Sequence, residues 1–400
     1  MKFNKWTLGL AAVGAVSLSS AVTARAVEAN MNAVETMLQG VTISGGVDAS
    51  LEWAASPTGN DYWGSPASGI PLRGPEKQDG FNLNLVELTI EKPLSEDQWA
   101  SGFTVQMVMG PDAVNYNPSV NSAHDVAVPD GEGYDVETQG SWADFGLKQA
   151  YIALRTPIGN GIDWKFGVFD TIIGYEVFES WKNVNFTRSW GWYDEPTQHT
   201  GLLGSYTVND YVSFSAGVAN TLTPFINAKN TSGDGFENRW CKTWMASLTL
   251  TAPDSWGFLA GSTLYNGVVY GFDTFSGAQD RLNYYAGAVI NTPVEGLTTG
   301  LSFDYVDFGT TPSDKHYILG GYASYRLTDK LSVHGRGEYA WYEYDSYDGC
   351  WWELTGTIQY DLWANVISRV ELRYEHDDEF DYYGESKCGL LLAANINYVF

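Results

Sequence analysis

The chain has 400 residues and a formal net charge of −26 at pH 7, because 48 Asp and Glu residues outnumber 22 Lys and Arg residues. This acidity excludes nucleic acids and other polyanions as partners, since basic surfaces bind such ligands. Aromatic residues make up 15% of the chain and there are 43 glycines, a composition that suits transmembrane β-barrels better than ordinary soluble domains.

The N-terminus has the pattern of a secretory signal peptide. Lys2 and Lys5 precede an apolar run over 6–22, and Ala24-Arg25-Ala26 follows as a cleavage site, so we expect residues 1–26 to be removed. The sequence contains no other apolar stretch of about 18 residues, the length that a spanning helix needs. A closed barrel is then the remaining way for this chain to cross a membrane.

Residues 27–40 differ from both their neighbours. Met31, Val34 and Leu38 recur at helical spacing and Gly40 follows, which predicts a short amphipathic helix before the barrel. A disordered leader is the alternative interpretation of the same residues.

The rest of the chain alternates between apolar and polar residues with the period of a β-strand. Short connections rich in Asn, Asp, Gly and Pro take turns with long acidic ones, as in bacterial barrels with both termini in the periplasm. Sixteen strands are predicted, at 41–54, 82–92, 101–109, 145–156, 163–170, 199–208, 211–219, 240–252, 257–270, 281–291, 297–308, 316–327, 330–344, 351–360, 366–376 and 388–400.

The last predicted strand shows how the two faces differ. Ile396, Tyr398 and Phe400 share one face, and Asn395 and Asn397 share the other. A soluble sandwich would bury the apolar face against a second sheet, but sixteen such strands with tight turns at one end only favour lipid outside and water inside. We therefore predict an all-β protein in which residues 41–400 form a single transmembrane antiparallel barrel of about sixteen strands, with short periplasmic turns and long outer loops.

Several segments resemble Gram-negative outer-membrane porins. The terminal "INYVF" is similar to the signal that the outer-membrane assembly machinery reads, which implies that machinery as a partner of Phe400, beside outer-membrane lipid and lipopolysaccharide. Residues 164–192 and 195–220 are more specific, because they resemble the β-barrel porin-2, or OmpL-like, family. The matching features are Gly174 and Glu176, followed by Thr200 and Gly201 on the next strand.

This resemblance implies that the third outer loop, 171–198, folds into the barrel and narrows the pore. The loop supplies four candidate constriction charges and several aromatic residues that could pack it against the wall. The alternative is a loop that lies over the barrel mouth. The charges are Glu176, Glu179, Lys182 and Arg188.

Strand parity predicts a basic wall opposite this loop. Acids on the loop and arginines across an aqueous gap would create a transverse field that orients dipolar solutes. Alternatively, the arginines pair with Glu338, Glu353 and Glu371 on their own wall. The wall residues are Arg326, Arg336, Arg369 and Arg373, and inward-facing Arg155 and Lys165 lie on the strands that could brace the loop.

Other chemistry is weakly indicated. Scattered histidines and the absence of a nucleophile motif predict no enzyme and no catalytic residue, and no spacing suggests a metal or cofactor. The acidic clusters 130–137 and 375–381 fit solvated loops better than cation sites. Cys350 and Cys388 lie at the outer ends of strands with one strand between, so a disulfide is one option.

The outward faces around 321–356 are poor in bulk, which indicates either a subunit interface of a homotrimer or strand curvature. The small residues are Gly321, Ala323, Gly335, Gly337 and Gly356.

Together these features predict an outer-membrane porin for passive diffusion of small hydrophilic solutes and ions. The alternative function is a surface receptor, adhesin or structural barrel with a closed lumen.

Overall fold

The computed structural model describes residues 40–55, 77, 79–115, 145–227, 242–273, 279–309, 314–344, 347–378 and 387–400. The predicted signal peptide, residues 27–39 of the predicted leading helix, Cys241 and the acidic cluster 130–137 lie outside these residues.

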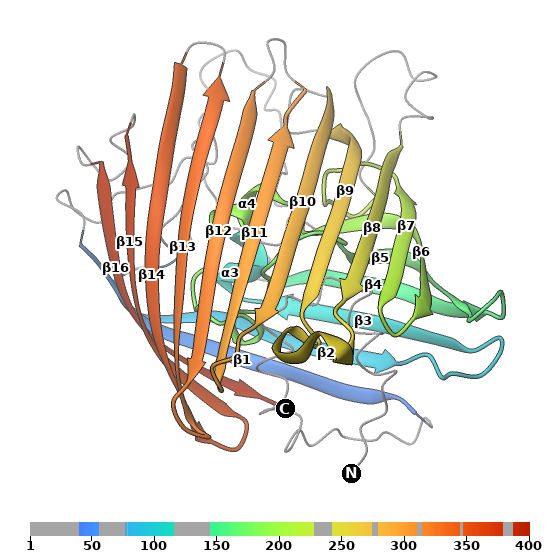
Figure 1. Ribbon diagram of the computed structural model, residues 1–400, viewed down its shortest axis with the longest axis horizontal. Helices are drawn as coiled ribbons and strands as arrows, with labels where there is room; N and C mark the ends of the chain where they lie inside the picture. Colours follow the sequence, from blue (N-terminus) through green and yellow to red (C-terminus); the bar gives the residue numbers. More distant parts are fainter. Residues whose placement is uncertain are drawn as a thin grey trace, which may run out of the picture.

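Sixteen antiparallel strands close into one barrel, as the sequence predicts (Figure 1). Each strand pairs with its neighbours along the chain, and β1 closes the ring against β16 with Gly46 opposite Val399. The strands are β1 Thr42–Ala55, β2 Gly80–Lys92, β3 Ser101–Met109, β4 Phe145–Thr156, β5 Ile162–Asp170, β6 Gln198–Asn209, β7 Val212–Ala219, β8 Thr243–Thr251, β9 Thr263–Asp273, β10 Gln279–Asn291, β11 Leu297–Asp307, β12 Lys315–Arg326, β13 Leu331–Tyr344, β14 Tyr347–Trp363, β15 Val366–Asp377 and β16 Cys388–Val399.

In the described residues, four short helical turns interrupt the connections between strands. Helix α3 is Pro111–Asn115 and α4 is Trp190–Asp194, while the 3-10 turns are η1 Ser180–Lys182 and η3 Asp254–Leu259. No helix in the described part of the chain is both long enough and apolar enough to span a membrane.

Two predicted boundaries are wrong. The ninth strand begins at Thr263 rather than 257, because η3 occupies the turn and Gly257 has a φ of +64° that breaks extended structure. The fourteenth strand begins at Tyr347 rather than 351, since β13 and β14 continue pairing up to Tyr344 opposite Tyr347.

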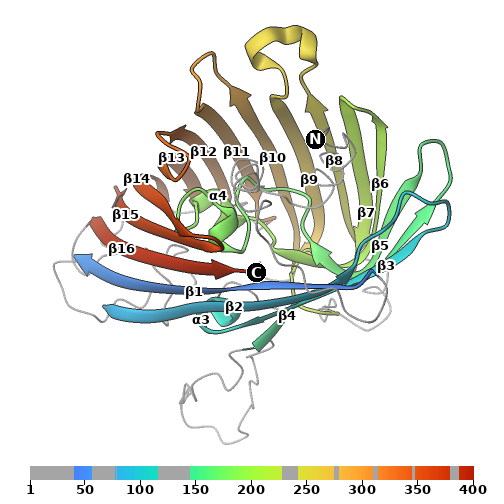
Figure 2. The same ribbon diagram turned by 90° about the horizontal axis from the view of Figure 1, so that it is seen from below.

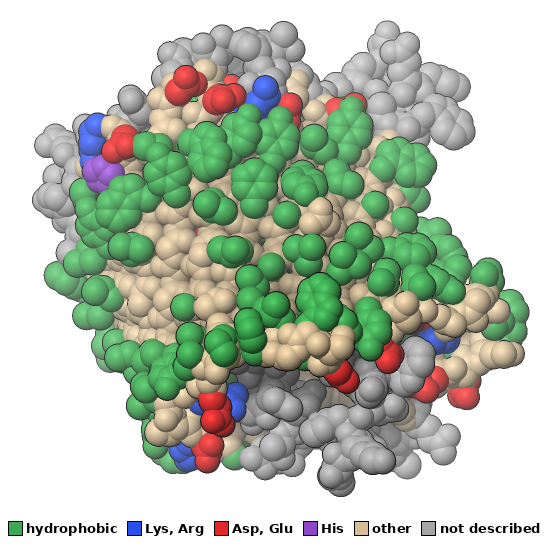
Figure 3. Space-filling view, viewed as in Figure 1, with side chains coloured by type: hydrophobic (Ala, Val, Ile, Leu, Met, Phe, Trp, Pro, Cys, Tyr) green, Lys and Arg blue, Asp and Glu red, His purple; other side chains and the backbone are tan. Residues whose placement is uncertain are grey.

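The faces of the barrel follow the predicted parity. On β16 the side chains of Leu392, Ile396 and Tyr398 are 44–49% exposed, while Asn395 and Asn397 are buried. Figure 3 shows hydrophobic side chains across the outer wall, with acidic and basic side chains at its two ends. Because hydrocarbon excludes charge and unsatisfied polar groups, this is the surface that faces lipid.

The C-terminal residue completes the closure of the ring. The backbone N–H of Phe400 donates to the carbonyl of Gly45, and the N–H of Gly45 donates to the carbonyl of Phe400, both at 2.9 Å. The chain end lies at the same end of the barrel as η3 and the short turns (Figure 1).

A charge placed on the middle of the outer wall should destabilise the barrel. Leu372 lies midway along β15 and Leu327 lies in a turn beyond β12, and each is 49% exposed. We expect Leu372→Arg to lower the free energy of unfolding in lipid vesicles by about 2–4 kcal/mol, and Leu327→Arg to lower it by about 0–1 kcal/mol. Denaturant titration followed by tryptophan fluorescence measures both values, and equal losses would contradict the assigned lipid face.

Candidate functional site

The segment between β5 and β6, residues 171–197, lies inside the barrel. Most of its side chains are buried, and they contact inward-facing residues of strands on several sides of the ring. The view from below shows α4, which belongs to this segment, surrounded by strands (Figure 2). We call residues 171–197 the inner segment.

Arg336 of β13 joins the inner segment to the wall. Its guanidinium donates to Glu176 and to the carbonyl of Thr187, at 2.8 and 2.7 Å. It also donates to Glu353 of β14 at 2.8 Å. The side chains of Arg336 and Glu353 are fully buried and that of Glu176 is 1% exposed, so these contacts join buried groups directly.

Two further arginines bind the backbone of the inner segment. Arg369 of β15 donates to the carbonyls of Ser180 and Asn183, both at 2.8 Å. Arg373 donates to the carbonyl of Arg188 and pairs with Glu375 on its own strand. Because the inner segment has little regular structure, its buried carbonyls need such donors.

Carboxylates on the wall accept hydrogen bonds from the backbone N–H groups of the inner segment. Glu371 accepts from the N–H groups of Phe186 and Thr187 at 2.5 and 2.9 Å. Glu338 accepts from the N–H groups of Trp190 and Gly191, which are the first residues of α4. Negative charge at a helix start is favourable because the first amides there lack intrahelical partners.

These contacts correct the predicted aqueous gap between the loop acids and Arg336, Arg369 and Arg373. The three arginines are at most 2% exposed and lie against the inner segment, while Arg336 also pairs with Glu353. Of the two sequence-based interpretations, pairing along the same wall is present at Arg336 and Glu353, while direct contact with the inner segment replaces the expected gap.

The other predicted basic residues lie elsewhere. Arg326 is exposed at the last position of β12, beside a short turn. Arg155 pairs with Asp163 at 3.3 Å, and the ammonium of Lys165 sits over the ring of Tyr151 at 4.9 Å. The contacts of Arg155 and Lys165 are with their own or a neighbouring strand rather than with the inner segment.

The four loop charges differ in their access to water. The side chains of Glu176, Glu179 and Arg188 are 1–3% exposed, whereas that of Lys182 is 43% exposed. Glu179 accepts from Lys182 at 3.0 Å and from Gln106 of β3 at 2.5 Å. Burial alone would raise the pKa of Glu179, but Lys182 and Lys148 hold it below its ordinary value.

Polar residues near the barrel seam also bind the inner segment, and sequence reasoning missed them. Asp48 of β1 is buried and accepts from Ser180, from Asn84 of β2 and from Asn395 of β16. Asp112 of α3 lies 3.8 Å from Arg188 and pairs with Lys77 at 2.8 Å. A buried contact at Asp48 could have been predicted from the sequence, since an inward-facing carboxylate near the middle of a strand needs a partner.

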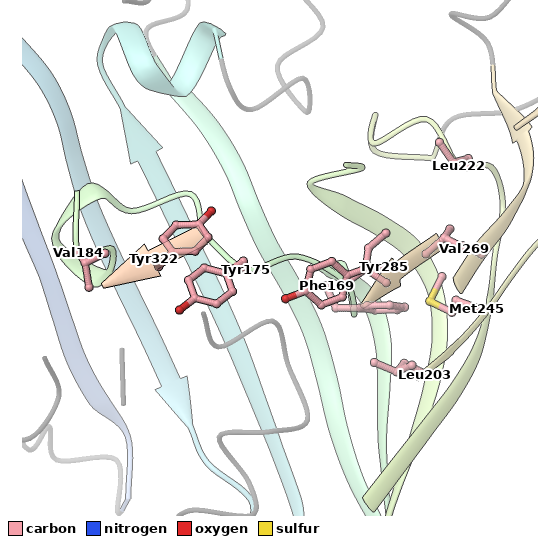
Figure 4. Close-up of a cluster of buried hydrophobic side chains, with 11 residues drawn as sticks. Phe169, Tyr175, Val184, Leu203, Leu222, Met245, Val269, Tyr285 and Tyr322 are labelled. Atoms are coloured by element: carbon pink, nitrogen blue, oxygen red, sulfur yellow. The ribbon is translucent and has the colours of Figure 1, made fainter. Parts of the chain in front are cut away.

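Aromatic rings pack the inner segment against the wall. Tyr175 stacks on Tyr322 of β12 (Figure 4), and their ring centres are 3.9 Å apart. The ring centres of Trp190 and Trp351 of β14 are 3.8 Å apart. The cluster that contains Tyr175 and Tyr322 extends around Phe169 to side chains of β6, β8, β9 and β10; these further members include Ile173, Leu203, Met245, Val269 and Tyr285. The inner segment is therefore held on both sides by apolar contact as well as by charge.

Comparison with known proteins identifies the family. The model of the family described as "Putative beta-barrel porin-2, OmpL-like" matches residues 40–397. The chain belongs to this family of outer-membrane porins. None of the curated proteins matches the sequence.

Solved structures share the fold of this porin-family barrel at low sequence identity. The anion-selective porin from Comamonas acidovorans has a TM-score of 0.59 and 12% identity, over 90% of this chain and 99% of its own. The outer-membrane channel DcaP of Acinetobacter baumannii has a TM-score of 0.58 and 11% identity, over 92% and 100%. OprB of Pseudomonas putida has a TM-score of 0.57 and 13% identity, over 90% and 94%.

A buried acidic cluster lies where the inner segment leaves α4 in this OmpL-like barrel. Burial and the carboxyl of Asp304 on β11 raise the pKa of Glu195 well above its ordinary value. Asp194 pairs with His316 at 2.5 Å, and its backbone carbonyl accepts from Arg281 and Asn283 of β10. Among the described residues, no group of His, Cys, Asp and Glu side chains is arranged to hold a metal ion.

The free energy of unfolding should fall as the pH rises from the ordinary pKa of a glutamate to the raised pKa of Glu195. A carboxyl whose pKa is raised on folding keeps a proton that the unfolded chain releases, so the stabilisation is lost with rising pH, by up to about 1.4 kcal/mol for each pH unit. We expect Glu195→Gln to flatten the dependence of the unfolding free energy on pH above the ordinary carboxyl pKa.

The matched control is Glu295→Gln, at an exposed short turn, which should leave the dependence unchanged. Parallel pH profiles for wild type and Glu195→Gln would show that Glu195 is not the titrating group.

Proposed function

We propose that this barrel is a channel for the passive diffusion of small hydrophilic solutes and ions, and that the inner segment narrows the path through it. The observation that carries the proposal is the anchoring of the inner segment to opposite parts of the ring. It is bound by Asp48 on β1, Gln106 on β3, Arg281 on β10, Arg336 on β13 and Arg369 on β15. Sieving by width requires no covalent step, so the proposed role is not that of an enzyme.

The charge available to a passing ion is smaller than the basic wall suggests. Glu353 neutralises Arg336 and Glu375 neutralises Arg373, and each of these arginines also donates to one backbone carbonyl of the inner segment. Lys182, with 43% of its side chain exposed, is the predicted loop charge that reaches water. We infer weak ion selectivity, with Lys182 as its main contributor from the inner segment.

A closed barrel that serves as a receptor or adhesin is the second candidate. The apolar group around Phe169, together with Trp190 and Trp351, fills space on both sides of the inner segment. A lumen filled in this way would leave no continuous water path, and the conductance experiment below separates the two functions.

A homotrimer would use the outer face of β11–β14. A shallow apolar groove there is lined by Gly321, Ala323, Gly335, Gly337 and Gly356, and the glycines allow another surface to approach closely. One structure with the same fold, OmpT of Vibrio cholerae, is described in a trimer form. We propose a second copy of this chain as the occupant of the groove.

Lipid and lipopolysaccharide are the proposed partners of the remaining outer wall, because hydrophobic side chains gather in bands on that wall and charged side chains lie at its two ends (Figure 3). Phe400 is the proposed contact for the outer-membrane assembly machinery, and its place at the barrel seam supports a role in closure.

Conductance in planar bilayers tests the proposed channel. We expect the purified protein to give stepwise currents, and a shorter Gly-Ser linker in place of residues 176–192 to give larger steps because the constriction is gone. Wild type that conducts with steps no smaller than those of the linker variant would contradict the constriction. Steps from the linker variant alone would favour the closed barrel.

Selectivity tests the role of Lys182. We expect Lys182→Gln to raise the cation-to-anion permeability ratio by a few-fold, because it removes a water-accessible positive charge while keeping a donor for Glu179. The reversal potential in a salt gradient measures this ratio. Lys330→Gln, at an exposed short turn, is the matched control, and equal reversal potentials for both variants would contradict the assignment.

A further inference from the structure

A group of reactive side chains lies on the outer wall of the barrel, away from the inner segment. It occupies the ends of β14, β15 and β16 opposite the short turns, and its members are Cys350, Tyr374, His376, Asp378 and Cys388. His376 and Tyr374 pack beside Trp352, with ring centres 5.8 and 5.2 Å away. The His376 side chain is 24% exposed and that of Asp378 is 51% exposed, so the group reaches water above the aromatic residues.

These side chains form one chain of hydrogen bonds. The sulfur of Cys388 is 3.1 Å from Nδ1 of His376 and accepts from the hydroxyl of Tyr374 at 3.0 Å. Nε2 of His376 is 2.9 Å from Oδ1 of Asp378, and the other carboxyl oxygen of Asp378 accepts from the thiol of Cys350. Backbone pairing holds Cys388 beside His376, since the two residues lie opposite each other in the β15–β16 register.

The two cysteines play opposite roles in this chain. Cys350 donates its proton to a carboxylate, which favours the thiol, whereas Cys388 accepts from the hydroxyl of Tyr374 and can pass its own proton to Nδ1 of His376. Hydrogen bonds from Cys350 and His376 lower the pKa of Asp378, so its carboxylate is ionised and orients the imidazole. The resulting order of thiol, imidazole and carboxylate is the arrangement that activates a nucleophilic cysteine.

We propose that Cys388 is a nucleophilic thiol that exchanges with low-molecular-weight disulfides at the outer surface of the cell, with His376 as its base and Asp378 as the residue that positions His376. The proton of Cys388 passes to Nδ1 of His376, and the thiolate attacks one sulfur of the disulfide. A new S–S bond forms to Cys388 as the old one breaks. The leaving thiolate takes the proton from His376, so one thiol is released for each thiol consumed.

Cys350 does not attack the mixed disulfide at Cys388 within the same barrel. Strand β15 lies between β14 and β16, which separates the backbones of Cys350 and Cys388 by about 10 Å, beyond the reach of a disulfide at about 7 Å. Both residues are thiols in the structure, so the disulfide considered from the sequence is not formed. Cys388 therefore retains the small thiol until another reductant removes it.

Single-cysteine proteins test the proposal, with Cys241→Ser in each. One carries Cys350→Ser and keeps Cys388, and the other carries Cys388→Ser and keeps Cys350. Reaction with a chromogenic aromatic disulfide is followed between about pH 6 and about pH 9 on folded protein in detergent. We expect Cys388 to react about 10-fold faster than Cys350 near pH 6.5, because His376 takes up the proton of Cys388 whereas the carboxylate of Asp378 holds the proton of Cys350.

The His376→Phe change in the Cys388 protein should remove most of this advantage, and denaturant should make the two cysteines equally reactive. Oxidised glutathione should give a mixed disulfide at Cys388 that mass spectrometry detects. Equal rates and equal pH profiles for the two folded single-cysteine proteins would overturn the proposal. That comparison leaves His376 intact, so it decides the matter even if His376→Phe does not fold.

Discussion

A strand that crosses hydrocarbon finds no water to hydrogen-bond its backbone, so every N–H and C=O group must find a partner in the next strand. This constraint closes the sheet, and here β16 returns to β1 with Phe400 and Gly45 exchanging backbone hydrogen bonds at the seam. Closure then gives each strand one face toward lipid and one face toward the interior of the barrel. Alternate side chains face lipid on one side and the interior on the other, which sets where charge can be placed at all.

The interior has the reverse problem, because the inner segment brings irregular backbone into a space walled by strands. Its carbonyl and N–H groups lack the backbone hydrogen bonds that neighbouring strands make with each other. Ionised side chains of the wall bind these groups instead. Arg369 serves the carbonyls of Ser180 and Asn183, while Glu371 serves the amides of Phe186 and Thr187. Buried ion pairs add little net stability but are costly to break singly, so we interpret these contacts as fixing one position of the segment.

The alternation of side chains made the barrel, its strand number and its two faces predictable from sequence. Parity also identified the inward arginines Arg336, Arg369 and Arg373, because face depends only on position along a strand. Their partners on the inner segment were not predictable, since Thr187 and Ser180 bind through backbone atoms that carry no sequence signal. Asp48 was missed although its inward position was available, because its partner Ser180 lies 132 residues away.

The net negative charge of the chain therefore does not describe the charge inside the barrel. Inward carboxylates such as Glu338, Glu353 and Glu371 are taken up by arginines or by backbone amides of the inner segment. Because a paired charge has a weak field at a distance, the net charge of −26 says little about which ions the lumen would prefer. Selectivity in such a barrel depends on the few side chains that remain in contact with water, and Lys182 is placed to be one of them.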